Sequence, residues 1–298
     1  MSPTFSVITP VYNGRAYIRR AWRMLQLQTF ADWEWVVVDD GSTDGTSDAV
    51  RAIVDRRVRL VHYDKNRGRG YARTQALLAA RGQWLAVWDV DDLYFPDRLA
   101  KADEARRAGY DFCCSYAVVV DNDLAIKGVR GFLPASGLLP RVCVHPTLAC
   151  RADLARSIGY AAHCWAGEDS KMLLALPAGY RGCYYDDALT IYVEDREVTL
   201  AKAIGSNWWL WQHVGELHRE GQLPGTRRAW WTFQARMVAR LIALNALRLA
   251  PWLYRRTVKH RSFGQTAASW NLSPERMAFI EWLRTGRWEH EPWQSKAA

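Results

Sequence analysis

The stretch WLAVWDVDD, from Trp84 to Asp92, says more about the fold than any other part of the sequence. Its first five residues are all apolar, which is typical of a strand buried on both faces of a parallel sheet. Three carboxylates follow, at Asp89, Asp91 and Asp92. Because ligands of open α/β sheets bind beyond the carboxyl ends of the strands, this stretch predicts both a sheet and the position of its site.

The flanking sequence alternates between runs typical of strands and runs typical of helices. Strands are expected over 5–9, 33–38, 58–63, 113–120 and 124–129, and helices over 16–28, 42–54, 71–81 and 96–107. Ser42 or Thr43 is the expected N-cap of the second of these helices. Alternation of this kind predicts an α/β fold with right-handed crossovers.

Composition excludes several other classes of protein. The 298 residues are 49% hydrophobic and 24% charged, which is the balance of a folded domain and not of a disordered or fibrous chain. Apolar runs fall short of the roughly 18 residues of a membrane-spanning helix, and residues 1–10 lack the pattern of a signal peptide. We therefore expect a cytoplasmic protein. The six cysteines contain no C-x-x-C pair, so reduced core residues are expected instead of disulfides or a zinc site.

The net charge of +9 belongs to one end of the chain. Residues 1–199 hold 25 Lys and Arg against 25 Asp and Glu, whereas residues 200–298 hold 15 against 6, a difference of 9. This contrast predicts two regions with different roles, 1–199 and 200–298.

The triplet Asp89-Val90-Asp91 places two carboxylates on one side of an extended chain, because side chains alternate along it. Two carboxylates that lie so close together repel each other unless a cation lies between them. Hard oxygen ligands of this kind suit Mg²⁺ or Mn²⁺. A solvated acidic turn or a helix N-cap would explain the same residues, so the triplet alone leaves both interpretations open.

Two other strand ends carry polar or aromatic groups. A carboxylate at Asp39 or Asp40 could accept hydrogen bonds from a ribose hydroxyl or a base N–H, as acidic residues do in nucleotide-binding α/β folds. A helix cap is the alternative there, and it is the favoured role of Ser42. Tyr12 is either a ring that packs on a base or an ordinary packing residue.

Taken in order, these motifs resemble those of the family 2 glycosyltransferases. The shared elements are TPVYNG at 9–14, QTF-x-D-W-E-x-V-V-V-D-D-G-S-T-D-G-T at 28–46, N-x-G and A-R at 66–73, DVDD at 89–92 and GED at 167–169. The resemblance covers roughly residues 4–195. It implies a glycosyltransferase-A fold, in which a mixed, mostly parallel sheet is flanked by helices.

The resemblance also implies a nucleotide pocket beyond the first two strands. In the family, the stretch that matches Thr9, Pro10 and Tyr12 lines the base pocket. Asp39 and Asp40 would follow on the same rim, with Asp40 accepting a hydrogen bond from the base, usually uracil.

The same resemblance assigns the sugar and diphosphate end of the donor. Asn66 and Arg73 would help to hold the nucleotide, and Asp89 would approach the ribose or the sugar. Asp91, with Asp89, would ligate the Mn²⁺ or Mg²⁺ that bridges the diphosphate. Asp92 would support this site or face the sugar.

Glu168 and Asp169 match the family's downstream E-D motif. Asp169 would be the general base that deprotonates the acceptor hydroxyl, with Glu168 beside it as a further catalytic candidate. One base opposite one leaving group gives a single displacement, and hence inversion at the anomeric carbon.

Three positions depart from the family pattern. Thr74 replaces the asparagine of A-R-N, and residues 192–196 lack the histidine that assists the metal in many relatives. Glu194, Asp195 or water could take its place. His145 matches a position near the acceptor site in relatives, and a structural histidine is the alternative.

The C-terminal region, 200–298, is rich in tryptophan and arginine and is expected to be helical. Trp230, Phe233, Met237, Leu241 and Leu244 recur at helical spacing and predict a buried stripe. The region could form a lid, a dimer interface or a surface that docks on anionic membrane lipids. It lacks the order of a nucleic-acid-binding module.

The sequence therefore predicts a metal-dependent, inverting glycosyltransferase that uses a nucleotide-diphosphate sugar, with UDP as the expected nucleotide. The acceptor would be a glycan or a lipid-linked glycan in cell-surface polysaccharide synthesis, met in the cytoplasm or at the inner face of the membrane. The alternative is a nucleotide-sugar or glycan-binding module that keeps the fold without turnover.

Overall fold

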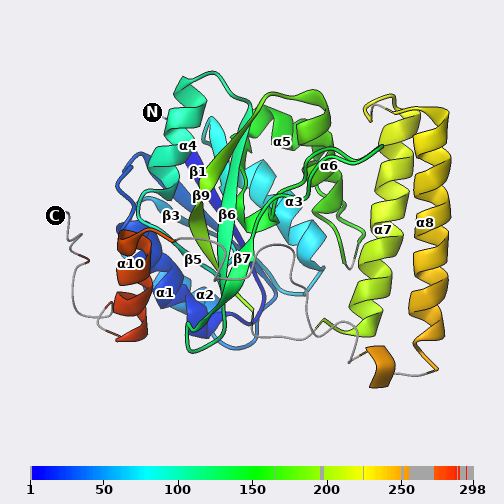
Figure 1. Cartoon of the computed structure of the whole chain (residues 1–298). Coiled ribbons are helices and arrows are strands. Elements are labelled where there is room, and N and C mark those ends of the chain that lie inside the picture. The colour runs from blue at the N-terminus through cyan, green and yellow to red at the C-terminus, as the bar shows by residue number, and fades with distance from the viewer. Residues whose placement is uncertain are drawn as a thin grey trace.

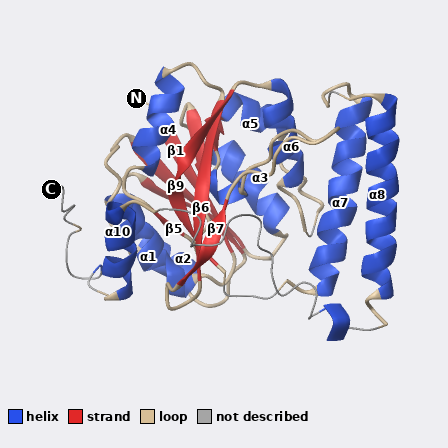
Figure 2. Ribbon diagram, viewed as in Figure 1, coloured by secondary structure: helices blue, strands red, loops and turns tan. Residues whose placement is uncertain are grey.

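A central sheet with helices on both faces forms the body of the protein, and a two-helix hairpin lies beside it (Figure 1 and Figure 2). The computed structural model describes residues 2–164, 166–194, 198–223, 225–249, 252–254 and 272–286, together with Trp288 and Trp293. Asp195 and the basic residues at 255, 256, 259 and 261 lie outside the described residues.

The strands of the described chain join one sheet. They are β1 (Phe5–Val11), β2 (Trp33–Asp40), β3 (Val58–Tyr63), β4 (Trp84–Val87), β5 (Leu93–Tyr94), β6 (Phe112–Val120), β7 (Ile126–Arg130), β8 (Ala149–Arg151) and β9 (Gly182–Val193). Their order is β3-β2-β1-β4-β8-β6-β9-β5, with β7 paired to β6.

The sheet is mixed, as predicted. β1 runs parallel to β2 and β4, and β2 runs parallel to β3, so the carboxyl ends of these four strands meet at one end of the sheet. β8 runs antiparallel to β4 and β6, and β9 returns parallel to β6. The motifs that follow β1, β2 and β4 are thereby brought together.

Helices connect the strands and cover both faces of the sheet (Figure 2). They are α1 (Arg15–Gln26), α2 (Thr46–Arg51), α3 (Arg69–Ala79), α4 (Arg98–Arg107), α5 (Ala152–Ile158), α6 (Ser170–Gly179), α7 (Leu200–Arg219), α8 (Arg227–Ala246) and α10 (Pro274–Arg284). A short 3₁₀ turn spans His145–Thr147.

The helix expected over 42–54 is shorter and begins later than predicted. α2 starts at Thr46, after Gly45, whose φ of 87° lies in the left-handed region that favours glycine. The Ser42 hydroxyl accepts a hydrogen bond from the Asn13 N–H at 2.8 Å, and the Thr43 N–H donates to the Asn13 side chain at 2.9 Å. The predicted N-cap at Ser42 or Thr43 is therefore wrong, because these residues join two loops.

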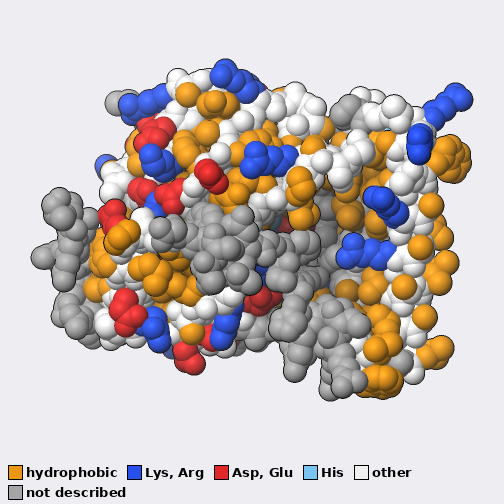
Figure 3. All heavy atoms as spheres, in the orientation of Figure 1, with side chains coloured by type: hydrophobic (Ala, Val, Ile, Leu, Met, Phe, Trp, Pro, Cys, Tyr) orange, Lys and Arg blue, Asp and Glu red, His pale blue; other side chains and the backbone are white. Residues whose placement is uncertain are grey.

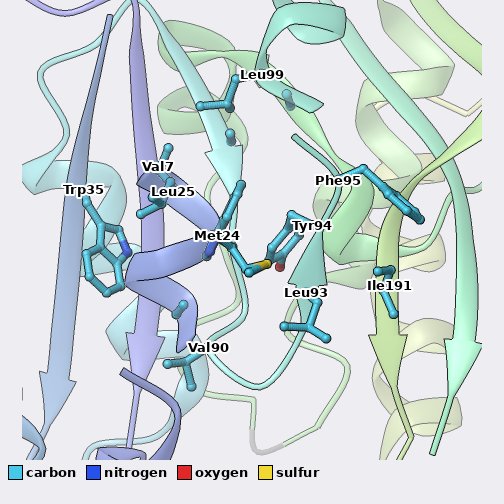
Figure 4. Packing of buried hydrophobic residues seen from close by; sticks show 14 of the residues in the cluster. Val7, Met24, Leu25, Trp35, Val90, Leu93, Tyr94, Phe95, Leu99 and Ile191 are labelled. Carbon is cyan, nitrogen blue, oxygen red and sulfur yellow. The ribbon is translucent and has the colours of Figure 1, made fainter. Parts of the chain in front are cut away.

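The apolar stretch Trp84–Trp88 lies in the core, as its composition predicts, with every side chain buried. The Trp88 ring stacks on Tyr94 with ring centroids 3.7 Å apart. Met24 of α1 belongs to the same buried cluster and lies beside Tyr94 (Figure 4). The six cysteines are free thiols and five of them are buried, as expected.

The C-terminal region divides between two sides of the sheet. α7 and α8 form a hairpin that packs on α6, through a cluster that includes Leu174, Val214 and Met237. α10 lies at the opposite side of the molecule, beside α1 (Figure 1). There Phe279 joins the main core, its ring 5.4 Å from that of Phe95. Within the described residues, none of the helices combines the length and the apolar character needed to cross a membrane.

Replacement of Phe279 by alanine tests whether α10 is part of the core. We expect Phe279→Ala to lower the free energy of unfolding by about 3–5 kcal/mol, because a fully buried aromatic ring leaves a cavity. Urea unfolding followed by circular dichroism measures this change. Met277→Ala on the exposed face of the same helix is the control, with an expected change of about 0.5 kcal/mol or less. Equal effects of the two substitutions would contradict the docking of α10.

Candidate active site

A cavity of about 410 Å³ opens at the carboxyl ends of β1, β2 and β4. It is also lined by residues of α3, the end of β9 and the start of α7. The predicted site residues that it brings together are Pro10, Tyr12, Asp40, Asn66, Arg73, Asp89, Asp91 and Asp92. These eight residues therefore lie around one cavity at one end of the sheet.

Asp40 holds the loop that leads into α3. Its carboxylate is buried and accepts hydrogen bonds from the backbone N–H groups of Arg67 at 3.0 Å and Gly68 at 2.8 Å. Gly41 has a φ of 76° and lies so close to the backbone of residues 65 and 66 that any β-carbon would clash. Tyr12 stands opposite this loop with half of its side chain exposed. An open aromatic face and a fixed carboxylate at one rim suit a nucleobase.

Arg73 of α3 is a buried cation between two carboxylates. Its Nη2 donates hydrogen bonds to Asp89 Oδ1 at 3.1 Å and to Asp89 Oδ2 at 3.3 Å. Its Nε lies 3.5 Å from Glu168 Oε1. Burial alone would lower the pKa of Arg73, but the two carboxylates hold it above its usual range. This single side chain connects the end of β4 to the start of α6.

His145 supports Arg73 and does not line the cavity. Its ring is buried, and Nε2 lies 2.8 Å from Arg73 Nη1 and 2.9 Å from the Tyr160 hydroxyl. Burial, reinforced by the Arg73 charge, lowers the pKa of His145 well below its usual value, so the imidazole is neutral. The sequence left His145 as either a residue near the acceptor site or a structural histidine, and these contacts fit a structural histidine.

The turn Asp89–Asp92 presents two carboxylates to the cavity and buries a third. Asp92 Oδ1 accepts from the Val193 N–H at 3.0 Å, while its Oδ2 has no hydrogen-bond partner among the described residues. Burial, together with the charges of Asp91 and Asp89, raises the pKa of Asp92 well above its usual value. Asp92 thus joins the turn to the end of β9, and Asp89 and Asp91 line the open side.

The donor set suits a divalent ion that arrives with a substrate. Among the described residues, no group of three His, Cys, Asp or Glu side chains is arranged to hold a metal ion. Mg²⁺, however, is commonly held by one or two carboxylates, with substrate phosphates and water completing its shell. Asp89 and Asp91 can supply those carboxylates.

Glu168 and Asp169 lie where α6 begins. Glu168 is buried against Arg73, and Asp169 occupies the N-cap position of the helix. Burial and the neighbouring Glu168 charge raise the pKa of Asp169 to about 6, although the Arg73 charge opposes this shift. A carboxylate with a pKa near the working pH is well matched to proton abstraction.

The lining of the cavity does not include His145, Glu168 or Asp169, nor two further predicted residues, Thr9 and Asp39. The Thr9 hydroxyl donates to the Trp88 carbonyl at 2.7 Å and accepts from Trp35 Nε1 at 2.8 Å. Asp39 is fully buried, where its carboxylate accepts from the Ser42 N–H at 2.9 Å and from the Ser47 hydroxyl. Both hold the strand ends in place.

The lining also includes residues that were not predicted as site residues from the sequence, among them Tyr17, Arg69, Val198 and Lys202. Arg69 is within the N-x-G to A-R stretch and could have been found there. Val198 and Lys202 come from the start of α7, where no motif signals a role. Thr74, the departure from A-R-N, donates its hydroxyl to the Gly70 carbonyl of its own helix at 2.9 Å.

Comparison with solved structures identifies the fold. The chain matches S. aureus TarS 1–349 in complex with UDP with a TM-score of 0.58, 24% identity, and coverage of 72% of this chain and 65% of that one. It matches the mannosyltransferase PcManGT from Pyrobaculum calidifontis, in complex with GDP-Man and Mn²⁺, with a TM-score of 0.57, 19% identity, and coverage of 98% and 89%. The fold is that of the glycosyltransferase-A class, as predicted.

Sequence comparison places the chain within that class. Residues 6–145 match the model described as glycosyl transferase family 2. The match covers just under half of the chain, and over these residues it confirms the resemblance read from the motifs.

Curated relatives carry names from polysaccharide synthesis. The putative teichuronic acid biosynthesis glycosyltransferase TuaG of Bacillus subtilis is 41% identical over 101 residues, which cover 33% of this chain and 40% of that protein. The succinoglycan biosynthesis protein ExoO of Rhizobium meliloti is 43% identical over 122 residues, which cover 41% and 35%. The matches thus span less than half the length of either relative.

The raised pKa of Asp169 predicts a pH-dependent stability. Between the unfolded value of 3.8 and the folded value of about 6, the folded state holds more protons, so stability falls as pH rises through this window. Relative to Asp169→Asn, the wild-type free energy of unfolding should fall by up to about 3 kcal/mol between pH 4 and pH 7. Urea unfolding of both proteins at the two pH values measures the difference.

Asp48→Asn serves as the control, because Asp48 is on the exposed face of α2. A stability difference between wild type and Asp169→Asn that does not change with pH would contradict the raised pKa.

Proposed function

We propose that the protein is a metal-dependent, inverting glycosyltransferase. It moves a sugar from a nucleotide-diphosphate donor, UDP in this proposal, to a hydroxyl of a glycan or lipid-linked acceptor. The observation that carries the proposal is the convergence of Asp40, Asp89 and Asp91 on one cavity, with Arg73 connecting them to Glu168 at the start of α6.

The nucleotide end of the donor is assigned to Tyr12 and Asp40. The Tyr12 ring is open to the cavity, and the lone pairs of Asp40 that its loop leaves free can accept from a base N–H. UDP is supported by the similar TarS structure, which holds UDP, and by the name of an Escherichia coli relative, a UDP-Glc-dependent glucosyltransferase 35% identical over 94 residues. The GDP-Man complex of PcManGT shows that the same fold accepts another base.

The diphosphate end is assigned to Asp89 and Asp91. These carboxylates would hold Mn²⁺ or Mg²⁺, and the bound ion would stabilise the negative charge that develops on the departing nucleoside diphosphate. Arg73 keeps Asp89 in place through two hydrogen bonds. Arg20 steadies the same turn, since its Nη2 donates to the Asp91 carbonyl at 3.2 Å.

Asp169 is assigned as the general base. A carboxylate at the start of α6 can take the proton of the acceptor hydroxyl as that oxygen attacks the anomeric carbon, and the bond to the leaving phosphate then breaks. Attack opposite the leaving group inverts the anomeric centre in one displacement. The charge of Arg73 keeps Asp169 ionised at neutral pH, because it opposes the effects of burial and of Glu168.

The proposed acceptor is supported by the substrate that the name of one relative states. The E. coli relative is named for an acceptor linked to diphosphoundecaprenol, and the matched segment covers 32% of this chain and 37% of that protein. A lipid-linked glycan of this kind would be met at the inner face of the cytoplasmic membrane. Polysaccharide synthesis at the cell surface is the process that we propose.

Thermal unfolding with a nucleotide panel tests donor binding. UDP at about 100 times its dissociation constant should add roughly 2.7 kcal/mol to the stability of the protein, and only when Mn²⁺ is present. Asp91→Asn should abolish this stabilisation, whereas the exposed control Asp48→Asn should keep it. A larger shift with GDP would correct the nucleotide, and a UDP shift that does not depend on Mn²⁺ would contradict the metal assignment.

Turnover tests the assignment of Asp169 as the base. Asp169→Asn should lower kcat by about 10²–10⁴, as expected for loss of a general base, while the UDP-induced thermal shift is unchanged. Release of UDP from UDP-sugars, followed with undecaprenyl-diphosphate-linked acceptors, measures the rate. UDP binding without turnover in the wild type, across the donor and acceptor panel, would favour the non-catalytic binding module.

A further inference from the structure

The outer face of α8 exposes an apolar stripe. The exposed fractions are 68% for Trp231, 41% for Val238 and 65% for Ile242, and Leu249 just beyond the helix is 90% exposed. Steps of seven, four and seven residues separate these four positions, so they fall along one line of a helix with 3.6 residues per turn. We call these four residues the α8 outer face.

The opposite side of the same helix already serves the fold. Phe233 and Met237 are buried against α6 and α7, and Leu241 is buried on the same side of α8. The α8 outer face points away from the sheet, and orange side chains line the right-hand edge of the molecule in Figure 3. Packing within the described chain therefore leaves this stripe without a role.

Charge sets this part of the chain apart. Residues 221–274 contain nine Lys and Arg and not one Asp or Glu. Five of the nine are described: Arg227, Arg228, Arg236, Arg240 and Arg248. Arg227 and Arg228 begin α8, four and three residues before Trp231, and so lie within about 60° of the α8 outer face around the helix. Arg236 and Arg240 lie about 120–180° around the helix from it. The α8 outer face thus begins beside two arginines, in a stretch without Asp or Glu, and is complementary to a surface with an apolar interior and anionic head groups.

We propose that the α8 outer face docks on a membrane surface rich in anionic phospholipid. Trp231, Val238 and Ile242 enter the boundary between head groups and acyl chains, and Arg227 and Arg228 at the start of the helix bind lipid phosphates. Helices that lie in the membrane plane combine an apolar face with Lys or Arg side chains. The attraction to anionic lipid falls off within a Debye length, so it requires close approach and weakens with salt.

A second copy of the chain fits this surface less well. A contact between two α8 outer faces would cover Arg227 and Arg228 of each copy. With no acidic residue between 221 and 274, this stretch offers them no carboxylate partner. The same charges favour an anionic bilayer.

The docking surface is connected to the cavity through α7. This helix begins beside Val198 and Lys202, which line the cavity, and its first turn is capped by the Thr199 hydroxyl, which accepts from the Lys202 N–H at 3.2 Å. α7 then packs along α8. A bilayer bound at α8 would thus be held at a defined position relative to the cavity. This inference does not depend on glycosyl transfer.

Co-sedimentation of the full chain with lipid vesicles tests the proposal without donor or acceptor. The protein should bind vesicles that contain about one third phosphatidylglycerol and should bind pure phosphatidylcholine at least about tenfold more weakly. Binding to the anionic vesicles should fall as salt is raised. Equal binding to both vesicles, or none to either, would overturn the proposal.

Matched variants separate the α8 outer face from exposed apolar residues in general. Trp231→Ser with Ile242→Ser should weaken binding to anionic vesicles at least about tenfold. Val54→Ser with Leu78→Ser removes two residues that are at least as exposed on other elements, and it should bind like the wild type. Arg227→Gln with Arg228→Gln should reduce the salt dependence, whereas Arg236→Gln with Arg240→Gln should leave it nearly unchanged. Circular dichroism confirms that each variant is folded.

Sedimentation equilibrium distinguishes the competing occupant. A monomer in solution that binds anionic vesicles supports the proposal. A dimer that Trp231→Ser with Ile242→Ser dissociates, without vesicle binding by the wild type, would overturn it in favour of self-association. Because neither measurement involves a nucleotide, loss of vesicle binding and loss of UDP binding are independent results.

Discussion

The site depends on one buried guanidinium. Arg73 lies between Asp89, at the end of β4, and Glu168, at the start of α6, and these carboxylates could not converge in a dry environment without a positive charge between them. The guanidinium needs them in turn, since a buried cation without partners is strongly destabilising. Neutral His145 completes this arrangement because a protonated ring would face another cation. One side chain therefore fixes the distance between Asp89 and Glu168.

Arg73 is in turn positioned by the nucleotide rim. Asp40 binds the backbone of Arg67 and Gly68, and that loop sets where α3 begins, one turn before Arg73. Gly41 permits the close approach of the loop. A change at the base pocket would therefore be transmitted along α3 to Asp89 and Glu168. In the proposed function, the residue assigned to the base thus also supports the residues assigned to the reaction.

The parts of the fold and site that the sequence predicted are those fixed by local pattern. The run Trp84–Trp88 is apolar without interruption, and only a buried strand satisfies it. Motifs at the ends of parallel strands converge at one edge of the sheet, which explains why Asp40, Asp89 and Asp91 line one cavity. The prediction that Ser42 caps α2 was wrong because its hydroxyl accepts a hydrogen bond from the backbone N–H of Asn13. Asn13 is 29 residues away in the sequence, and no local rule reveals such a partner. Lys202 and the docking of Phe279 likewise depend on how the C-terminal helices return to the sheet.

The charges of the cavity bear on the proposed metal on grounds separate from any motif. Its lining holds the carboxylates Asp40, Asp89, Asp91, Asp92 and Glu194 and the cations Arg69, Arg73 and Lys202. Glu194 is paired with Arg130 at 2.6 Å outside the lining, and Arg69 and Arg73 are both drawn toward Glu168. A nucleoside diphosphate brought into this cavity would still approach the carboxylates of Asp89 and Asp91. A divalent ion held by these carboxylates, as proposed above, would offset that repulsion, so binding of the donor and binding of the metal should be coupled.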